Sequence, residues 1–304
     1  GEAYSLHNLG WTYRELKQLG EARDYLTQAL AIYTGLENRG SEATTRYGLA
    51  KVEYEAGNLS DARSQIEKAL DITESLRSNV VSQELRASYF TSVQKYYDLY
   101  IEILMKQNER QTGNGLDATA LQASERARAR SLLDLLSEAG ANIRQGADAK
   151  LLERENELTQ LINAKADRQV QLRVGNAPKE KIEVVTKELQ TLTTEFEQVQ
   201  ARIRASSPRY AALTQPQTLS LKEIQSLLDA DTLLLEYFLG DDRSYLWAVT
   251  ADDVRLVELP GRATIETRAR RLQRFLSASR TEPPTAIART QAETDMRVLG
   301  RMLL

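Results

Sequence analysis

This chain contains an internal sequence repeat of one helical segment, with the two copies forty residues apart. Residues 9–32 align with residues 49–72, so that Leu9 corresponds to Leu49 and Gly10 to the small Ala50. The other matches are Leu19 with Leu59, Ala22 with Ala62, Leu26 with Ile66, Ala29 with Ala69 and Ile32 with Ile72. A fixed period in this range is typical of stacked supersecondary units, which present a groove instead of a pocket.

Each copy is expected to form two helices. In the first copy, Leu6, Leu9 and Tyr13 share one face at helical spacing. Gly20 is expected to end the first helix of the first copy, and Gly57-Asn58 the first helix of the second. Small residues such as Gly10 let two helix axes approach closely, since a larger side chain would hold them apart.

This alternation of small and large residues, Leu9-Gly10, Tyr13, Ala22 and Ala29, resembles the tetratricopeptide repeat over residues 3–76. The period of forty is longer than the usual thirty-four or so of that family. The resemblance implies an α-solenoid, with residues 1–140 holding the helical repeats and the last repeat degenerate. An unrelated array of helical hairpins is the alternative.

In tetratricopeptide proteins the inner face of the first helices is the usual peptide-binding surface. The positions that fall on that face, away from the Leu9 and Leu49 side that packs the stack, are Tyr4, His7, Trp11, Arg14, Tyr47, Lys51 and Tyr54. Mixed aromatics and cations suit an extended partner segment with apolar anchors and acidic groups. Trp11 stands where carboxylate-clamp repeats have Asn, so that specificity is not expected. Alternatively, Tyr4 and Trp11 cover a further repeat before Gly1.

The helices that follow the two copies are expected at residues 82–107 and 118–138. The tyrosines of the first, from Tyr89 to Tyr100, are spaced for core packing instead of base stacking. The second contains Arg126, Arg128 and Arg130 beside acidic residues, which indicates a solvated, ion-paired face. These two helices would form the degenerate repeat.

Residues 148–206 carry a heptad pattern. The apolar positions are Ile182, Val185, Leu189, Leu192, Phe196, Val199 and Ile203, spaced alternately three and four apart. This spacing is a coiled-coil signature. A turn signal at residues 175–178 separates the seam from a looser arm at 151–174, which predicts an antiparallel coiled-coil hairpin. The hairpin could bind a partner, pack as a spacer, or join two chains into an oligomer.

The last segment, residues 218–304, changes to an α/β pattern. Strands are expected at 232–239, 244–250 and 254–259, and helices at 221–228, at 265–276 and after Pro283-Pro284 as far as Leu304. Ser220 is a plausible cap for the first of these helices. In the helix at 265–276, Arg268, Arg270, Arg271 and Arg274 are expected to point outward.

The order of motifs resembles a bacterial CHAT-domain protein that carries tetratricopeptide repeats. The motifs are Glu125-Arg126-Ala127-Arg128, Asp231-Thr232-Leu233-Leu234-Leu235-Glu236-Tyr237 and Tyr245-Leu246-Trp247-Ala248-Val249-Thr250. CHAT domains are similar to caspases and separase and use a His-Cys dyad. The resemblance implies that residues 218–304 begin a caspase-like α/β sheet and that the parent protein is a cysteine peptidase. No catalytic residue carries over, because the matching His and Cys are absent from this chain.

The residue inventory excludes several chemistries for these 304 residues. There is no Cys, and the one His is His7 in the first repeat, so a thiolate nucleophile or a cluster of His metal ligands is excluded. We expect no catalytic site, cofactor or metal in this chain. Asp241-Asp242 and Asp252-Asp253 suit turns, where Asp bonds the local backbone.

The charge balance bears on partners. Lys and Arg total 40 against 43 Asp and Glu, a net charge of −3, so a nucleic-acid partner is not expected. No apolar run reaches the roughly 20 residues that span a membrane, and no leader opens the chain; we expect a cytoplasmic protein.

The preferred function is a protein-binding scaffold and regulatory region of a CHAT-type cysteine protease. A standalone tetratricopeptide adaptor for complex assembly and a nucleic-acid-associated effector subunit are the alternatives.

Overall fold

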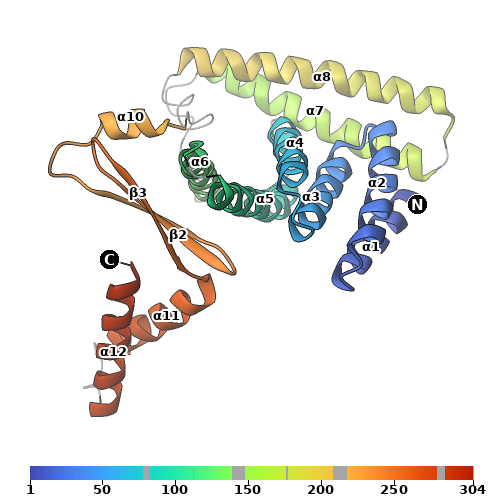
Figure 1. Cartoon of the computed structure of the whole chain (residues 1–304). Helices are drawn as coiled ribbons and strands as arrows, with labels where there is room; N and C mark the ends of the chain where they lie inside the picture. Colours follow the sequence, from blue (N-terminus) through green and yellow to red (C-terminus); the bar gives the residue numbers. More distant parts are fainter. Residues whose placement is uncertain are drawn as a thin grey trace. The chain divides into compact units, whose positions relative to one another are not determined.

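The computed structural model describes residues 1–77, 83–111, 113–138, 148–175, 177–207, 218–278 and 285–303. The chain is mainly helical and contains one small antiparallel sheet (Figure 1), which confirms the predicted mainly α class. Its contacts divide it into two compact units: Gly1–Gln107 with Glu125–Thr218, and Asn108–Ser124 with Leu219–Leu304.

The repeat region is a run of helices joined by short turns. Their bounds are α1 (Glu2–Glu15), α2 (Leu19–Gly35), α3 (Arg39–Glu55), α4 (Leu59–Arg77) and α5 (Gln83–Arg110). The turn residues Lys17, Glu37 and Gly57 all have positive φ, at 61°, 52° and 81°. These turns recur every twenty residues. Each forty-residue copy therefore consists of two helices, each followed by a turn.

These turns correct one sequence prediction. Gly57-Asn58 separates α3 from α4, as predicted. Gly20 does not end a helix, because it is the second residue of α2. The first break is at Lys17, forty residues before Gly57, where a non-glycine residue adopts the left-handed conformation. Left-handed backbone disfavours a side chain by about 1–2 kcal/mol, so the sequence signal for this turn is hidden.

The close approach of the repeat helices centres on Leu26 of α2, which is fully buried. A Cβ placed on Gly10 of α1 would lie 2.5 Å from Leu26 Cγ, and one on Gly48 of α3 would lie 3.4 Å from both Leu26 methyl carbons. Leu26 therefore sits between two glycines on neighbouring helices. The second copy replaces the first pair by Ala50 and Ile66, both fully buried.

The equivalent leucines of the two copies differ in burial. Leu49 of α3 is 4% exposed, whereas Leu9 of α1 is 41% exposed. The expectation that Leu9 lies on a packed face is therefore wrong for this structure. α3 packs against both α2 and α4, whereas α1 packs against α2 and only slightly against α3.

Helix α5 packs through tyrosines onto the second copy. Tyr97 is 2% exposed and donates to Glu74 at 2.9 Å, while the half-buried Tyr100 donates to Glu67 of α4 at 3.0 Å. The prediction that these rings pack in the core is confirmed for the described side chains. Side chains 77–92, with Tyr89, and 130–147, with Arg130, lie outside the description.

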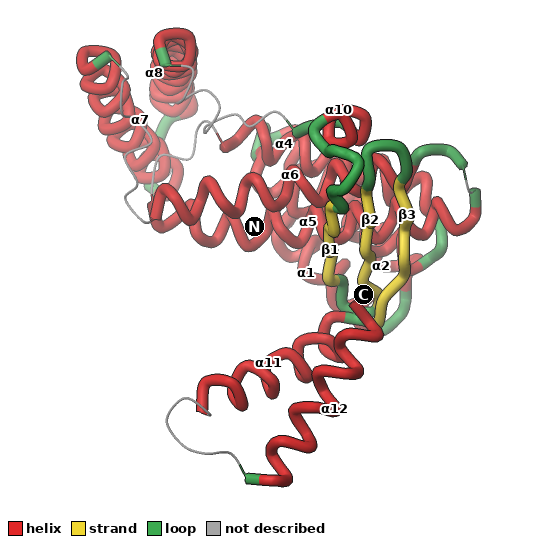
Figure 2. Tube along the Cα trace, turned by 90° about the vertical axis from the view of Figure 1, so that its left-hand side faces the viewer, coloured by secondary structure: helices red, strands yellow, loops and turns green. Residues whose placement is uncertain are grey.

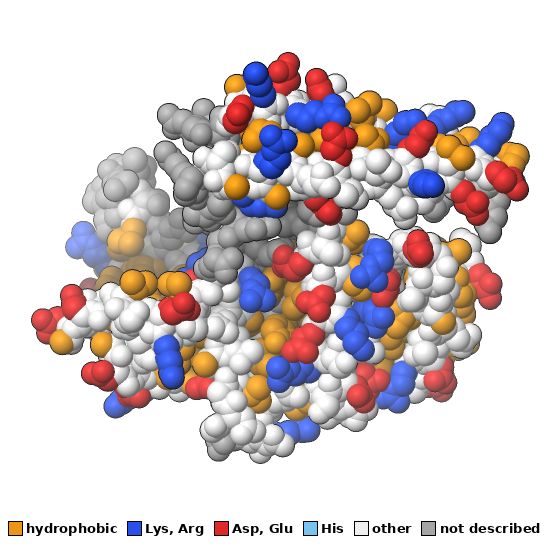
Figure 3. Space-filling view, turned by 90° about the horizontal axis from the view of Figure 1, so that it is seen from above, with side chains coloured by type: hydrophobic (Ala, Val, Ile, Leu, Met, Phe, Trp, Pro, Cys, Tyr) orange, Lys and Arg blue, Asp and Glu red, His pale blue; other side chains and the backbone are white. Residues whose placement is uncertain are grey.

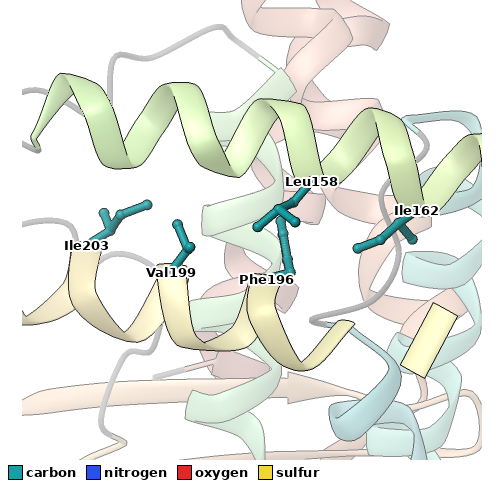
Figure 4. Packing of buried hydrophobic residues seen from close by; sticks show 5 residues of the cluster. All are labelled: Leu158, Ile162, Phe196, Val199 and Ile203. Atoms are coloured by element: carbon teal, nitrogen blue, oxygen red, sulfur yellow. The ribbon is translucent and has the colours of Figure 1, made fainter. Parts of the chain in front are cut away.

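Helices α7 (Ala149–Val174) and α8 (Lys179–Ser206) run antiparallel and share an apolar seam. Figure 4 shows its side chains pointing toward one another between the two helices: Leu158 and Ile162 from α7, and Phe196, Val199 and Ile203 from α8. Leu189 and Leu192 are partly buried against the same cluster.

Polar contacts flank the seam of α7 and α8. Lys165 pairs with Glu188 at 2.6 Å, and Arg154 pairs with Glu195 at 2.7 Å. In the space-filling view of Figure 3, basic and acidic side chains are interspersed over the visible face. Such exposed pairs contribute little stability, with a median of about 0–1 kcal/mol, so the apolar seam dominates.

The second unit is built on strands β1 (Leu234–Leu239), β2 (Arg243–Val249) and β3 (Val254–Pro260), an antiparallel sheet in the order β1-β2-β3. Figure 2 shows the three strands side by side. The three predicted strands are thus present.

Each face of the sheet is covered. On one face, Trp247 donates to the Asp117 carbonyl of α6 (Leu116–Glu138) at 3.1 Å, and Ser124 donates to the buried Glu236 at 2.9 Å. On the other face, Leu246 packs with residues of α11 (Arg262–Ala278) and α12 (Ala286–Leu303), among them Ile265 and Leu299. Because both faces are covered, β2 is largely buried.

Helix α10 (Leu221–Ser226) begins at Ser220, which forms a capping box with Glu223 and confirms the predicted cap. The outward placement of the α11 arginines is wrong for two of them. Arg268 and Arg271 pair with the buried Asp295 of α12 at 3.0 and 2.8 Å, because an isolated carboxylate buried there would be costly. The Pro283-Pro284 boundary lies outside the described residues.

We predict that Gly10→Ala weakens the α1–α2 packing by about 1–3 kcal/mol, because the new methyl collides with Leu26. The added Leu26→Ile change, which installs the Ala50/Ile66 combination of the second copy, should recover part of the loss. Hydrogen exchange of the α1 and α2 amides measures both effects. Gly20→Ala is the matched control, since no atom lies within 4 Å of its added Cβ; equal protection in both single variants would contradict the packing argument.

We predict that Phe196→Ala destabilises the α7–α8 pair by about 3–5 kcal/mol, because the ring is 5% exposed within the seam. Faster hydrogen exchange should appear in both helices, since each depends on the other for burial. Val184→Ala, at a position 58% exposed on the same helix, should change exchange little. If only α8 responds to Phe196→Ala, the antiparallel pairing is wrong.

Candidate functional site

Four rings form a continuous row across α1, α3 and α5, which we term the aromatic ladder: His7, Trp11, Tyr47 and Tyr96. Ring centroids are 6.3 Å apart for His7–Trp11, 6.1 Å for Trp11–Tyr47 and 4.6 Å for Tyr47–Tyr96, where the rings stack. These distances lie near the 4.5–7 Å typical of favourable ring pairs. The ladder therefore joins the first helices of consecutive helix pairs.

These three helices run parallel. His7 contacts Thr45, Trp11 contacts Tyr47, and Arg14 contacts Glu55, so positions along α1 and α3 rise together. The contacts Tyr96–Thr44 and Lys106–Tyr54 repeat this relation between α3 and α5. Corresponding turns of the three helices thus lie beside each other, as in a stack of repeats.

A directional hydrogen-bond chain runs through His7. The Trp11 indole N–H donates to His7 Nε2 at 3.0 Å, and His7 Nδ1 lies 3.0 Å from Thr45 Oγ1. The Thr45 hydroxyl donates to the Ser41 carbonyl at 2.8 Å, so its oxygen is left to accept from His7. This network assigns the neutral tautomer with the proton on Nδ1.

Cations line the ladder. The Arg14 guanidinium lies 5.2 Å from the Trp11 ring centre, and Lys51 lies 5.8 Å from that of Tyr47. Lys106 lies 4.5 Å from the Tyr54 ring centre. These distances are within the roughly 6 Å reach of cation–π attraction. The row thus offers both flat apolar surface and positive charge.

Acidic groups balance these cations. Glu55 accepts from Arg14 and pairs with Lys17 at 3.1 Å. Burial is the main reason that the pKa of Tyr47 is raised, and the charges of Glu102 and Asp98 of α5 add to it. The site therefore carries both signs of charge, and its aromatic surface is its distinguishing feature.

The pKa values follow from this packing. Burial lowers the pKa of His7 below its ordinary value. Burial, with Tyr96 beside it, raises the pKa of Tyr47 to about 12, and burial also raises the pKa of Tyr96. Burial disfavours the charged form of Glu55, but hydrogen bonds from Arg14 and Lys17 outweigh it and lower its pKa.

The sequence-predicted groove residues fall into two groups. The structure brings five of them into the ladder or onto its rings: His7, Trp11, Arg14, Tyr47 and Lys51. Tyr54 contacts Lys106 of α5. Tyr4 is 63% exposed, and within the described residues no ring contact joins it to the ladder. Their role in binding stays a prediction.

Sequence reasoning missed Tyr96, Lys106 and Glu55. Tyr96 follows Tyr47 by 49 residues, so the forty-residue period points to Ala87 instead. The spacing of the α5 tyrosines predicts core packing, and Tyr96 is indeed 4% exposed, yet it also extends the ladder. Only the spatial register of α5 against α3 places it there.

The described residues contain no group of three or more His, Cys, Asp or Glu that could hold a metal ion. Asp241-Asp242 and Asp252-Asp253 lie between strands, as predicted. Within the same part of the chain, no helix is long and apolar enough to cross a membrane.

The tetratricopeptide-repeat family profile matches residues 1–75. This match confirms the repeat resemblance over α1–α4, and such repeats generally mediate protein–protein interactions. No curated protein and no solved structure matches the chain. The match ends before the residues on which the CHAT resemblance rests, so that resemblance has no support from the comparisons.

We predict that Glu55→Gln removes an acid-sensitive contribution of at most about 1 kcal/mol to the stability of the repeats. Its folded-state pKa is lowered, so the contribution is present above the unfolded value near 4.3 and is lost as the pH falls through the folded value. Thermal unfolding followed by circular dichroism between pH 3 and 7 measures it. Glu15→Gln, 73% exposed, is the control; identical pH profiles for both variants would refute the assignment.

Proposed function

We propose that this chain is a protein-interaction scaffold that holds a peptide segment of its partner against the aromatic ladder. One observation carries the proposal: rings from α1, α3 and α5 form one row, with Trp11 and Tyr47 only partly buried. Trp, Tyr and Arg are the residue types most enriched among the few positions that dominate binding energy.

The ladder is held rigid before any partner arrives. Trp11 is fixed by His7 on one side and by the Arg14 cation on its ring, and Tyr47 is stacked on Tyr96. A preorganised surface loses less side-chain entropy on binding, which costs about 0.5–1.5 kcal/mol for each side chain that must be ordered. The balanced charges favour a partner that contacts the ladder mainly through apolar or aromatic groups, with acidic groups at Lys51 and Lys106.

We further propose that residues 218–304 are the N-terminal part of a CHAT-type domain, with the repeats as its regulatory region. The supporting observation is the order of sheet and helices at the motif residues, where residues 231–237 lead into β1 and residues 245–250 form most of β2. A parent reading frame with a His and a Cys at strand ends would support this proposal. A frame without them favours the standalone adaptor.

The division into repeats at 1–140, a coiled-coil hairpin at 148–206 and an α/β segment at 218–304 stays part of this proposal. The contact-based units differ from it at one point, because residues 108–124 group with the sheet. Helix α6 contributes residues to both units. The seam of α7 and α8 gives that arm its stiffness.

We predict that Trp11→Ala together with Tyr54→Ala lowers peptide affinity at least tenfold, because both remove partly buried aromatic surface from the site. Peptides selected from a phage-displayed library against the intact chain, then measured by fluorescence anisotropy, provide the readout. Tyr25→Ala is the matched control, since Tyr25 stacks on Tyr13 at 5.1 Å, apart from the ladder. Selected peptides that bind the double variant as tightly as the native chain would show that the site lies elsewhere.

A further inference from the structure

His7 is the one histidine of the chain, and it occupies the start of the aromatic ladder. Both of its ring nitrogens are engaged: Nε2 accepts from the Trp11 indole, and Nδ1 faces the Thr45 hydroxyl. The first contact fixes a ring of the proposed binding surface, and the second joins α1 to α3. The titratable ring of His7 therefore fixes the position of Trp11 and also joins α1 to α3.

The direction of these hydrogen bonds requires the neutral ring. An indole N–H can only donate, and the Thr45 hydroxyl already donates to the Ser41 carbonyl. Protonated imidazole carries a proton on both nitrogens, so Nε2–H would face the Trp11 N–H with no acceptor between them. One of these two donors must then lose its partner, and a buried unsatisfied donor costs about 1–3 kcal/mol.

The surroundings do not compensate for a positive ring. On α1, the Arg14 cation lies over the ring of Trp11, the neighbour of His7 in the ladder. On α3, Glu42 lies one turn before Thr45 and already pairs with Arg39 and Arg46. These carboxylates and cations are committed to one another, and within the described residues no ion pair reaches His7.

Other charged groups lie beside Tyr47, which is two rings along the ladder from His7. Lys51 of α3 lies on the Tyr47 ring, and Asp98 and Glu102 of α5 act on Tyr47. Burial lowers the pKa of His7. Geometry and burial therefore favour the same neutral form.

We propose that His7 makes the aromatic ladder acid-sensitive: the ladder is complete while His7 is neutral and comes apart at its Trp11 end when His7 gains a proton. This is a regulatory property of the surface in the proposed function and rests on that function only for its effect on binding. It fits a scaffold whose occupancy falls on acidification.

The sign of the effect follows from the lowered pKa. An unfolded chain takes up a proton on His7 near pH 6.5, whereas the folded chain resists until a lower pH. The stability contributed by neutral His7 is thus fully present above about pH 6.5. It is lost progressively as the pH falls from there through the folded-state value.

The two tryptophans of the chain allow a test with an internal control. The Trp11 indole donates to His7, whereas the Trp247 indole donates to the Asp117 carbonyl, which does not titrate. In a nitrogen-15 spectrum of the intact chain between pH 7.5 and 5, we expect the Trp11 indole signal to shift upfield or broaden. Its midpoint should lie below 6.5 and match that of the His7 ring protons, while the Trp247 signal stays fixed.

His7→Gln is the informative variant, because a neutral amide can accept from Trp11 and donate to Thr45 but cannot titrate here. The Trp11 shift should then vanish, with the native-like indole signal retained at pH 5. A Trp11 signal that ignores pH while the His7 ring titrates overturns the proposal, and so does a His7 midpoint at or above 6.5. This readout needs no partner, so a failed peptide selection would count against the proposed function alone.

Discussion

The placement of Leu26 between Gly10 and Gly48 is the contact on which the repeat region depends. Because neither glycine has a side chain, α2 can approach α1 and α3 closely enough to bury Leu26 completely. A Cβ on Gly48 would also lie 3.4 Å from the Trp11 indole nitrogen, so this glycine makes room for the ladder as well. The absence of a side chain at Gly48 therefore leaves room both for the packing of Leu26 in the core and for the position of Trp11 in the ladder.

Polar contacts between α1 and α3 give the site its dependence on pH. His7 in the middle of α1 reaches Thr45, and Arg14 near its C-terminal end reaches Glu55, so polar contacts join α1 to α3 at two points. The contribution of each contact to stability changes with pH over a different pH range. The carboxylate loses its contribution in acid near its lowered pKa, and the histidine loses its contribution at a higher pH, below about 6.5. The repeat stack therefore combines a pH-independent contact at Leu26 with titratable contacts at His7 and Glu55.

The second unit is organised on a different principle. Within the described residues its sheet has three strands, and helices contact both of its faces. Trp247 anchors one face through its indole, and Leu246 packs the other. Where a carboxylate is buried between α11 and α12, at Asp295, two arginines neutralise it. Those arginines looked like surface charge in sequence because the pairing joins helices some twenty-five residues apart.

The sequence by itself determined the repeat, the apolar seam of α8, the three strands and five of the residues that gather at the ladder, because each rests on a local period or a copied segment. Tertiary structure decided the rest. The left-handed turn at Lys17 carries no glycine signal, and Tyr96 joins the ladder at an offset of 49 residues that no period of forty contains. The tautomer of His7 is likewise set by Trp11 and Thr45 together. Periodicity reports which face of a helix is buried, whereas the register between helices is fixed only when side chains meet in space.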